Sequence, residues 1–458
     1  MKNRNKQKRQ QLTKKKILLW TIVTILVMSV PVSATDATLR SSTLRSTSWP
    51  QWRGPFFNGS TDEKNLPRSW SQTEGIAWVS PLPGPSGATP IIFNGRVFVS
   101  SMVKRGPDFV ALCFDAQDGR KLWEEHIGSD SRRFPRNNMA SPSPVTDGKY
   151  VFFLYGSGDL LGFDYEGNKL WSRNIETEYG NLALKFGYSS SPLLYRNKLF
   201  ILAVRRNKPY RRPEADAPLD SYLMALDPPT GKTIWKQQRP TNAFDEAMET
   251  YSTSVPFVRN GRAEILNTGA DFITAHDPDT GKELWRFEYH TSKVRDSRII
   301  PSLVTGEGLI FGTRHKHGGV FALQPPNPNN PSQGRIVWEF DGPSPDAGTP
   351  LYYQKRLYVL NGIKYGKVVT CLEPKTGRKI WQGKIGGRGP WRASLTGADG
   401  KLYCINETGE IVVLAAGDNE FKIIFQTKIE EGPIQSSIAI ADGHLFIRTA
   451  KNLYCIGK

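Results

Sequence analysis

The chain has 458 residues, of which 38% are hydrophobic, 11% are aromatic and 42 are glycine. These apolar side chains suffice for a core, which excludes a generally disordered chain, and the glycine content favours short strands joined by tight turns. The formal net charge is +18, but the lysines and arginines are scattered along the sequence and accompany no nucleic-acid-binding module. We therefore expect a solvated, mildly cationic surface and no nucleic-acid partner.

The first 34 residues have the three parts of a secretory signal peptide. Residues 1–16 carry eight lysines and arginines and no acid, residues 17–30 are an apolar run, and Pro31-Val-Ser-Ala34 follows. This order predicts a signal peptide at 1–34, cleaved near Ala34, and a periplasmic or secreted protein. An uncleaved anchor is the alternative, although 14 apolar residues are few for crossing a bilayer. After cleavage we expect no transmembrane domain, and removing eight positive charges lowers the net charge from +18 to +10.

An internal repeat dominates the rest of the chain. Its unit is a short apolar strand, an acid, a turn with glycine, a basic or polar residue, two further residues and a tryptophan, as in Asp115-Ala-Gln-Asp-Gly-Arg-Lys-Leu-Trp123. A glycine stands four positions before the tryptophan in six copies, which end at Trp123, Trp171, Trp235, Trp285, Trp338 and Trp381. We interpret each copy as a β-hairpin whose acid accepts turn N–H groups and whose tryptophan packs between neighbouring sheets as a structural residue.

A second series of turns marks another hairpin in each unit. Eight such turns occur, many of them Asn-Gly or Asp-Gly between apolar runs, at residues 93–96, 146–149, 195–198, 259–262, 305–308, 353–356, 398–401 and 441–444. Small residues and a proline precede most of them, as in Ser141-Pro-Ser-Pro144 and Gly348-Thr-Pro350. Each unit therefore contains four strands, which is typical of a propeller blade.

The two ends of the repeat region are complementary. Residues 452–458 supply a third strand without a fourth, and Gly75-Ile-Ala-Trp78 resembles a lone fourth strand. We therefore predict an all-β, eight-bladed β-propeller over residues 75–458, closed when the N-terminal strand joins the C-terminal blade. Residues 35–74 form an N-terminal extension that contains Trp49-Pro-Gln-Trp-Arg-Gly-Pro55, whose role the sequence does not indicate.

Long, irregular connections place the candidate site on one face. In a propeller of this connectivity, the connections between blades and between second and third strands share a face; here they vary greatly, whereas the hairpin turns of the opposite face are mostly tight and uniform. We predict a ligand-binding entrance on this long-loop face. Its candidate residues are Arg136, Asn138, Tyr188, Tyr251, Arg298, Trp391 and Arg392.

Other residues give little indication of catalysis. We expect the four cysteines (113, 371, 404 and 455) to be buried free thiols, because similar positions in separate blades are too far apart to bridge. His315 and His317 have no further ligand at a suitable spacing, so we expect a solvated loop and no metal site. The sequence also lacks a Cys-x-x-Cys-His haem motif, a Gly-x-Ser-x-Gly elbow and a Walker loop.

The acid-x-x-x-Gly-x-x-x-Trp repeat resembles the PQQ repeat of quinoprotein dehydrogenases and of envelope-assembly propellers of the BamB type. The resemblance covers nearly all of residues 75–458 and implies the eight-bladed fold. A resemblance to the dehydrogenases implies a site that holds PQQ beside Ca²⁺, an aspartate that acts as the base and, often, a disulfide between adjacent cysteines. This chain has no adjacent cysteines, and no motif matches the aspartate or the calcium carboxylates.

The BamB-type resemblance implies a scaffold that contacts partners through its loops, although no cysteine for lipid attachment lies near the signal peptide. We therefore predict an exported, monomeric, non-catalytic propeller that binds an envelope protein or extracellular ligand, with no cofactor. A PQQ- and Ca²⁺-dependent dehydrogenase is the alternative, and a carbohydrate-binding propeller, suggested by the aromatic and arginine-rich loops, is a third.

Overall fold

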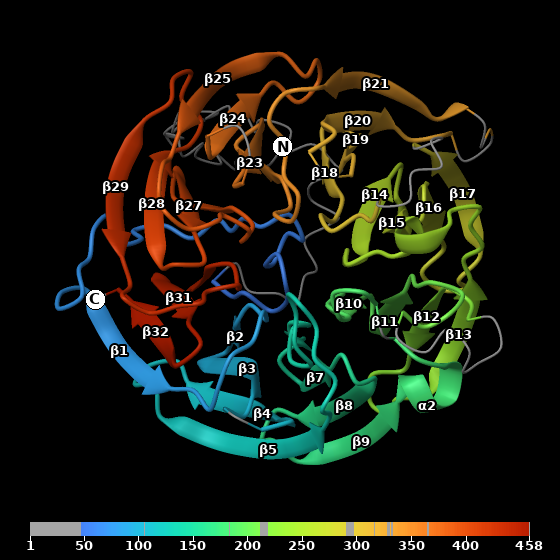
Figure 1. The fold of residues 1–458 in the computed structure, drawn as a ribbon, viewed down its shortest axis with the longest axis horizontal. Helices are drawn as coiled ribbons and strands as arrows, with labels where there is room; N and C mark the ends of the chain where they lie inside the picture. Colours follow the sequence, from blue (N-terminus) through green and yellow to red (C-terminus); the bar gives the residue numbers. More distant parts are fainter. Residues whose placement is uncertain are drawn as a thin grey trace, which may run out of the picture.

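The computed structural model describes residues 47–457 except 105, 183, 211–218, 290–296, 316, 328–329, 331–332 and 364–365. The described residues form eight four-stranded antiparallel sheets, arranged as the blades of a ring in Figure 1. The predicted signal peptide at 1–34 and the start of the extension lie outside the described residues. In the described part of the chain, no helix has the length and apolar composition that crossing a bilayer requires.

The first four blades follow the chain from the centre of the ring outward. Blade 1 contains β2 (Ile91–Phe93), β3 (Arg96–Met102), β4 (Asp108–Asp115) and β5 (Lys121–Ser129). Blade 2 contains β6 (Val145–Thr146), β7 (Tyr150–Leu154), β8 (Asp159–Asp164) and β9 (Lys169–Asn174). Blade 3 contains β10 (Leu193–Tyr195), β11 (Lys198–Ala203), β12 (Tyr222–Leu226) and β13 (Thr233–Gln238). Blade 4 contains β14 (Val255–Arg259), β15 (Arg262–Gly269), β16 (Phe272–His276) and β17 (Glu283–Glu288).

The remaining blades repeat this order, except that the outer strand of blade 8 comes from the N-terminal side of the propeller. Blade 5 contains β18 (Val304–Gly306), β19 (Leu309–Thr313), β20 (Val320–Gln324) and β21 (Arg335–Phe340). Blade 6 contains β22 (Leu351–Tyr353), β23 (Arg356–Asn361), β24 (Val368–Leu372) and β25 (Lys379–Lys384). Blade 7 contains β26 (Thr396–Ala398), β27 (Lys401–Ile405), β28 (Glu410–Ala415) and β29 (Ile423–Lys428). Blade 8 contains β30 (Ala439–Ala441), β31 (His444–Arg448), β32 (Asn452–Ile456) and, as its outer strand, β1 (Ile76–Pro81).

The predicted ring closure is confirmed. β1 pairs antiparallel with β32, with Ile76 opposite Ile456 and Pro81 opposite Asn452. Figure 1 shows β1 beside the C-terminal strands at the rim of the ring. The connections between blades contain two short helices in the described residues, α2 (Ile175–Tyr179) and the 3-10 helix η1 (Asp245–Met248). Neither helix was predicted from the sequence.

Most of the repeated tryptophans connect their blade to the next one. Each of the six lies on the outer strand of its blade, as predicted. In four blades the indole Nε1 donates to a carbonyl in the next blade: Trp171 to Pro228, Trp235 to Pro278, Trp338 to Pro374 and Trp381 to Asp418. The other two tryptophans differ: Trp285 in blade 4 donates to Glu264 Oε2 of its own blade, and Trp123 Nε1 in blade 1 is buried without a hydrogen-bond partner among the described residues.

The repeated glycine completes the same contact. A Cβ atom added to Gly231 in blade 3 would lie 2.5 Å from Cδ2 of Trp171 in blade 2. Gly281 faces Trp235 in the same way, and Gly377 faces Trp338. The four-residue spacing between glycine and tryptophan thus serves two interfaces, because the glycine receives the ring of the preceding blade while the tryptophan packs on the following one. This interlocking explains why the motif repeats so strictly.

A closed ring of hydrogen bonds surrounds the central channel. The residue just before the inner strand of each blade accepts, through its side-chain hydroxyl, the backbone N–H of the equivalent residue in the preceding blade. We name these eight residues the hydroxyl girdle; they are Thr89, Ser143, Ser191, Thr253, Ser302, Thr349, Ser394 and Ser437. The N···O distances range from 2.8 to 3.2 Å. The girdle satisfies backbone donors that the short inner strands leave unpaired.

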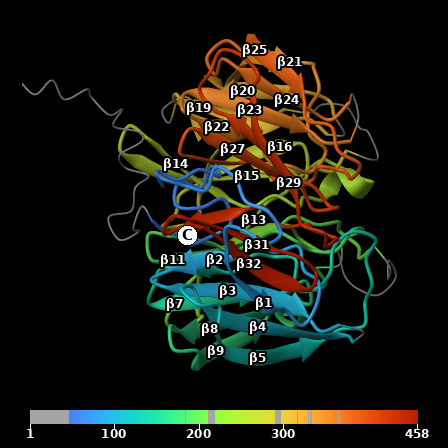
Figure 2. The ribbon, with the colours of Figure 1, turned by 90° about the vertical axis from the view of Figure 1, so that its left-hand side faces the viewer.

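The N-terminal segment, residues 47–66, spans the channel at the end that opens on the tight-turn face. Trp49 pairs with Ile92 of blade 1, and Ser60 pairs with Gly397 of blade 7. Phe57 packs edge-to-face on Tyr195 of blade 3, with ring centroids 5.9 Å apart. Figure 2 shows this segment (blue) on the left, the face of the tight hairpin turns, whereas the connections between blades lie on the right. The segment therefore braces widely separated blades and closes the channel on the tight-turn face.

Arg53 anchors this brace. Its guanidinium donates to the carbonyls of Pro350, at 2.8 Å, and Leu395, at 3.0 Å, which directly follow two girdle residues. It also donates to the carbonyl of Asn58. The side chain is only 4% exposed, and burial lowers the pKa of Arg53 to about 9, so the group keeps its charge at neutral pH.

Candidate functional site

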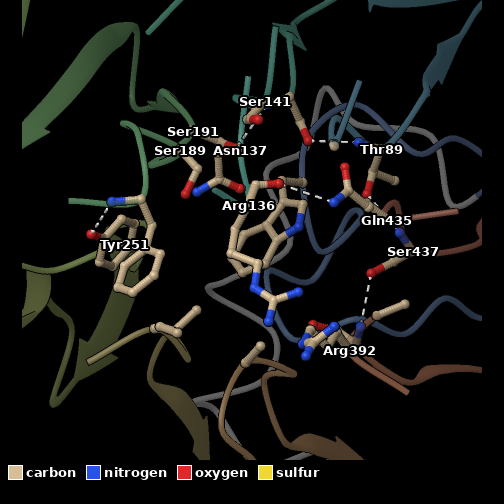
Figure 3. Close-up of a pocket in the computed structure, with 18 of the residues that line it drawn as sticks. Thr89, Arg136, Asn137, Ser141, Ser189, Ser191, Tyr251, Arg392, Gln435 and Ser437 are labelled. Atoms are coloured by element: carbon tan, nitrogen blue, oxygen red, sulfur yellow. Dashed lines mark hydrogen bonds between the residues drawn. The ribbon is translucent and has the colours of Figure 1, made fainter. Parts of the chain in front are cut away.

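A cavity of about 350 Å³ occupies the long-loop end of the channel. Most of its lining comes from the connections that lead into the eight blades, and Figure 3 shows the labelled side chains around it. The lining residues are Trp52, Gly87, Thr89, Arg136, Asn137, Ser141, Ser143, Phe186, Ser189, Ser191, Tyr251, Thr253, Arg298, Ile300, Asp346, Ala347, Arg392, Ala393, Ser394, Glu407, Gln435 and Ser437. The cavity is therefore a product of the whole ring rather than of one blade.

Polar hydroxyls and one indole form much of this lining. Six girdle residues contribute to it, and Ser141 and Ser189 add two more hydroxyls. Trp52, from the segment that closes the channel, contributes a partly exposed ring. The cavity therefore combines a ring of small polar side chains with an aromatic surface supplied by the N-terminal segment.

Two of the three lining arginines are held by carboxylates. Arg392 Nη1 lies 2.5 Å from Glu407 Oε1. Arg298 Nη1 lies 2.6 Å from Glu246 Oε1, and its Nη2 lies 3.9 Å from Asp346 Oδ2. Both carboxylates that line the cavity, Asp346 and Glu407, thus face an arginine. Such pairing fixes the positions of these charged side chains in the lining.

Arg136 differs from these two arginines. Its side chain is exposed, and within the described ranges its guanidinium meets no carboxylate at ion-pair distance. Its backbone carbonyl accepts a hydrogen bond from Gln435 Nε2 at 3.0 Å, which joins the connections that lead into blades 2 and 8. The lining therefore has three arginines against two carboxylates, with the surplus charge at Arg136.

A buried acidic pair supports one wall of the cavity. Glu246 is 1% exposed and accepts from Lys185 Nζ at 2.5 Å as well as from Arg298. Glu249 is fully buried, and its Oε2 accepts the Tyr251 hydroxyl at 2.6 Å. Burial raises the pKa of Glu249, and it also raises the pKa of Tyr251 well above the ordinary value. This network fixes the positions of Arg298 and Tyr251 along the wall.

Four of the seven candidate residues from the sequence line this one cavity: Arg136, Tyr251, Arg298 and Arg392. The other three do not. Asn138 caps a turn, where its Oδ1 accepts the N–H of Ala140. Tyr188 is 2% exposed and donates to the Leu202 carbonyl at 2.7 Å. Trp391 is also 2% exposed, and its Nε1 donates to the Gly386 carbonyl at 2.9 Å.

Several lining residues were not anticipated. Trp52 belongs to a segment whose role the sequence does not indicate, and Glu407 lies in a tight connection between β27 and β28. The girdle hydroxyls did give a signal, because several stand in the Ser-Pro and Thr-Pro sequences before the inner strands. We interpreted those sequences only as markers of a strand start.

The lining does not fit a Ca²⁺–quinone centre. Calcium prefers six to eight oxygen ligands with several carboxylates among them. The two lining carboxylates already face arginines, and the described residues contain no group of three or more His, Cys, Asp or Glu side chains that could hold a metal ion. The four cysteines are free and buried in four different blades, so no cysteine pair lies at the cavity.

Solved structures share this fold at low sequence identity. The chain aligns with a europium-containing methanol dehydrogenase at a TM-score of 0.66 and 10% identity, covering 91% of this chain and 99% of the other. It aligns with BamB from Moraxella catarrhalis at 0.55 and 12%, covering 82% and 98%. It aligns with a quinohemoprotein alcohol dehydrogenase from Comamonas testosteroni at 0.63 and 12%, covering 92% and 82%. At these identities the likeness extends to the fold alone.

Sequence comparison with curated proteins gives no significant match. A family model does match, over residues 61–208, 220–330 and 364–456, which together make up most of the chain. These residues include the outer strands that carry the repeated tryptophans, except Trp338. The chain therefore belongs to the PQQ_2 family of propellers, whose description is outer membrane protein assembly factor BamB.

Proposed function

We propose that this chain is a non-catalytic binding propeller that holds a protein or other envelope ligand on its long-loop face. One observation supports this proposal above the others: connections from all eight blades converge on one cavity, and both carboxylates in its lining are paired with arginines. The general base of an enzyme is most often an imidazole or a carboxylate that is free to take a proton. None of the described residues in the cavity lining is a histidine, and both acids among them face an arginine.

The shape of the molecule also favours binding. Interlocked blades form a rigid ring, and irregular connections on one of its faces carry the charged and aromatic side chains. Loops on a rigid scaffold commonly carry recognition, because they vary in sequence while the scaffold fixes their positions. The dehydrogenase alternative has the shared fold in its favour, but the residues at the cavity do not fit its metal and quinone.

We further propose that the protein is exported, either to the periplasm or out of the cell, and that it is a monomer. The support for export is the sequence of residues 1–34, with its basic start, its apolar run and the compact residues that end at Ala34. The mass of the protein recovered from the envelope fraction tests this proposal, because cleavage near Ala34 removes the first 34 residues. An intact mass in a cytosolic fraction would contradict it.

Site-directed photo-crosslinking in cells tests the binding face. A crosslinking amino acid replaces exposed Arg133, on the long-loop face, or exposed Lys375, in a hairpin turn of the opposite face. Both positions are basic and solvated, so they form a matched pair. We expect a discrete crosslinked protein, identified by mass spectrometry, from position 133 and none from position 375. Equal labelling from both positions would show that this face is not the binding surface.

Titration of purified protein with PQQ, with and without Ca²⁺, tests the alternative. We expect no saturable binding, because the donors that would hold the metal are absent from the described cavity lining. Saturable binding that requires Ca²⁺ would contradict the non-catalytic proposal and favour an oxidoreductase.

A further inference from the structure

The hydroxyl girdle gives the central cavity a specific chemistry. We propose that the cavity binds an oxyanion group, a carboxylate or a phosphate, carried by the ligand of the long-loop face. This inference rests on the proposed binding function and names the chemical group that the same cavity recognises. It is carried by the hydroxyls and by the unpaired Arg136, which together line one cavity.

Each girdle hydroxyl already accepts one hydrogen bond, and its own hydrogen remains available for donation. Ser143 Oγ accepts the N–H of Thr89 at 2.9 Å, and Ser191 Oγ accepts the N–H of Ser143 at 3.0 Å. Within the described residues, no girdle hydroxyl donates its own hydrogen to another group. A hydroxyl has one hydrogen to donate, and accepting a hydrogen bond makes it a stronger donor. The girdle therefore presents O–H donors to the cavity.

Two hydroxyls outside the girdle extend this donor surface. Ser141 Oγ accepts the N–H of Asn138 at 3.0 Å, and the Ser189 side chain has no hydrogen-bond partner in the described part of the chain. Figure 3 shows Thr89, Ser141, Ser189, Ser191 and Ser437 around the same space, with Arg392 on another side. Donors from several blades thus converge on one volume, as an oxyanion with several acceptor oxygens requires.

The charges around the cavity favour an anion over a cation. The two acids in the described lining, Asp346 and Glu407, face Arg298 and Arg392 respectively, so neither is free to attract a cation. Arg136 remains as a cation without a carboxylate, and it is exposed, so an incoming ligand can reach it. A guanidinium forms two parallel hydrogen bonds with a carboxylate or phosphate, which adds specificity to the attraction.

Trp52, Phe186 and Ile300 add apolar surface to the same lining. The group that carries the oxyanion therefore has an apolar contact available beside it.

Calorimetric titration of the mature protein with two probes tests this proposal. The probes are inorganic phosphate, which represents a free anion, and N-acetyl-triglutamate, which represents an acidic protein segment; N-acetyl-triglutamine is the neutral control. We expect saturable binding of at least one anionic probe, weaker at high salt, and none of the neutral control. Phosphate binding alone identifies a free anion as the source, and peptide binding identifies an acidic segment.

Two variants locate the binding in the cavity. Arg136→Gln is expected to weaken the binding of the anionic probe about tenfold or more, since a hydrogen bond to a charged group is worth that much. Ser189→Ala, which lies outside the girdle and leaves its ring intact, is expected to weaken binding by roughly threefold. Arg133→Gln makes the same charge change on the same connection without touching the cavity, and it should leave the affinity unchanged.

The proposal is overturned if neither anionic probe binds, or if Arg133→Gln weakens binding as much as Arg136→Gln. Either outcome leaves the crosslinking result at position 133 intact, so a failure of the anion proposal is distinguishable from a failure of the binding face. Loss of the crosslink together with normal phosphate binding would instead contradict the proposed binding face.

Discussion

The backbone N–H of Ser437 donates to Oγ1 of Thr89 across 3.2 Å, although the two residues lie 348 positions apart in the chain. This hydrogen bond completes the hydroxyl girdle between blade 8 and blade 1. It stands near the channel, whereas the β1–β32 pairing closes the same blade at the rim. The ring is thus sealed at both its inner and its outer radius.

Removing the acceptor at Thr89 should weaken the closed ring. Thr89→Val keeps the side-chain shape but leaves the buried N–H of Ser437 without a partner, so we expect a loss of about 1–3 kcal/mol in the free energy of unfolding. Thr89→Ser keeps the hydroxyl and serves as the control. Urea denaturation of both variants measures the difference, and equal midpoints would show that the girdle bond contributes nothing to stability.

The packing of a tryptophan against the repeated glycine of the next blade can be tested with two matched glycine substitutions. Gly231 and Gly261 both have positive φ, at +68° and +75°, but a Cβ atom at Gly231 would lie 2.5 Å from Trp171, whereas Gly261 has no atom within 4 Å of that position. Alanine at either site incurs backbone strain of about 1 kcal/mol. We expect Gly231→Ala to lose at least about 2 kcal/mol more, through displacement of the indole. Similar denaturation midpoints for the two variants would argue against the interlock.

His276 should make stability depend on pH. Burial lowers its pKa from 6.5 to about 4, and the neutral ring is held between the Gly281 carbonyl, at 3.1 Å, and Thr274 Oγ1, at 3.2 Å. The unfolded chain binds the proton first as pH falls, so this stabilisation is full above pH 6.5 and is lost towards pH 4. The loss amounts to about 3 kcal/mol. Denaturation of His276→Gln at several pH values should show a flatter dependence; an unchanged slope would assign the effect to other groups.

We expect Arg53 to contribute to the stability of the fold, although it lies outside the blades. Arg53→Gln removes hydrogen bonds to the carbonyls of Pro350 and Leu395 inside the channel, and we expect a loss of at least about 2 kcal/mol in the free energy of unfolding. Arg68→Gln, at an exposed position of the same extension, should change stability by less than about 0.5 kcal/mol. Thermal denaturation compares them, and equal melting temperatures would show that the brace carries little energy.

The fold was predictable because its signals are local and repeated. The glycine–tryptophan spacing and the second series of turns each report a hairpin, and six copies of the first with eight of the second leave few other architectures. The lone strand at Gly75–Trp78 identified the closure for the same reason, since the last blade lacked a fourth strand. Repetition thus compensates for the weakness of any single strand signal.

The cavity was only partly predictable because it is assembled from residues without a period. Long connections indicated the correct face, and the arginines at 136, 298 and 392 line the cavity there. Tyr188 and Trp391 stand in equivalent connections but are buried, because a large ring in such a connection packs on the neighbouring backbone as readily as it faces solvent. Trp52 lines the cavity because the N-terminal segment crosses the channel, and no local sequence pattern predicts that crossing.

The pairing of β1 with β32 has a consequence for biogenesis. The ribosome makes β1 before the other strands of the described propeller, but the strand with which it pairs there, β32, is the last one to be made. Throughout synthesis, β1 must therefore remain unpaired while seven blades and most of the eighth assemble behind it. Contacts between such distant segments form slowly, and an exposed strand is prone to pair with the wrong chain. A protein of this design consequently depends on the speed with which its last blade arrives, and a permuted chain that begins at β2 and ends with β1 would not share that dependence.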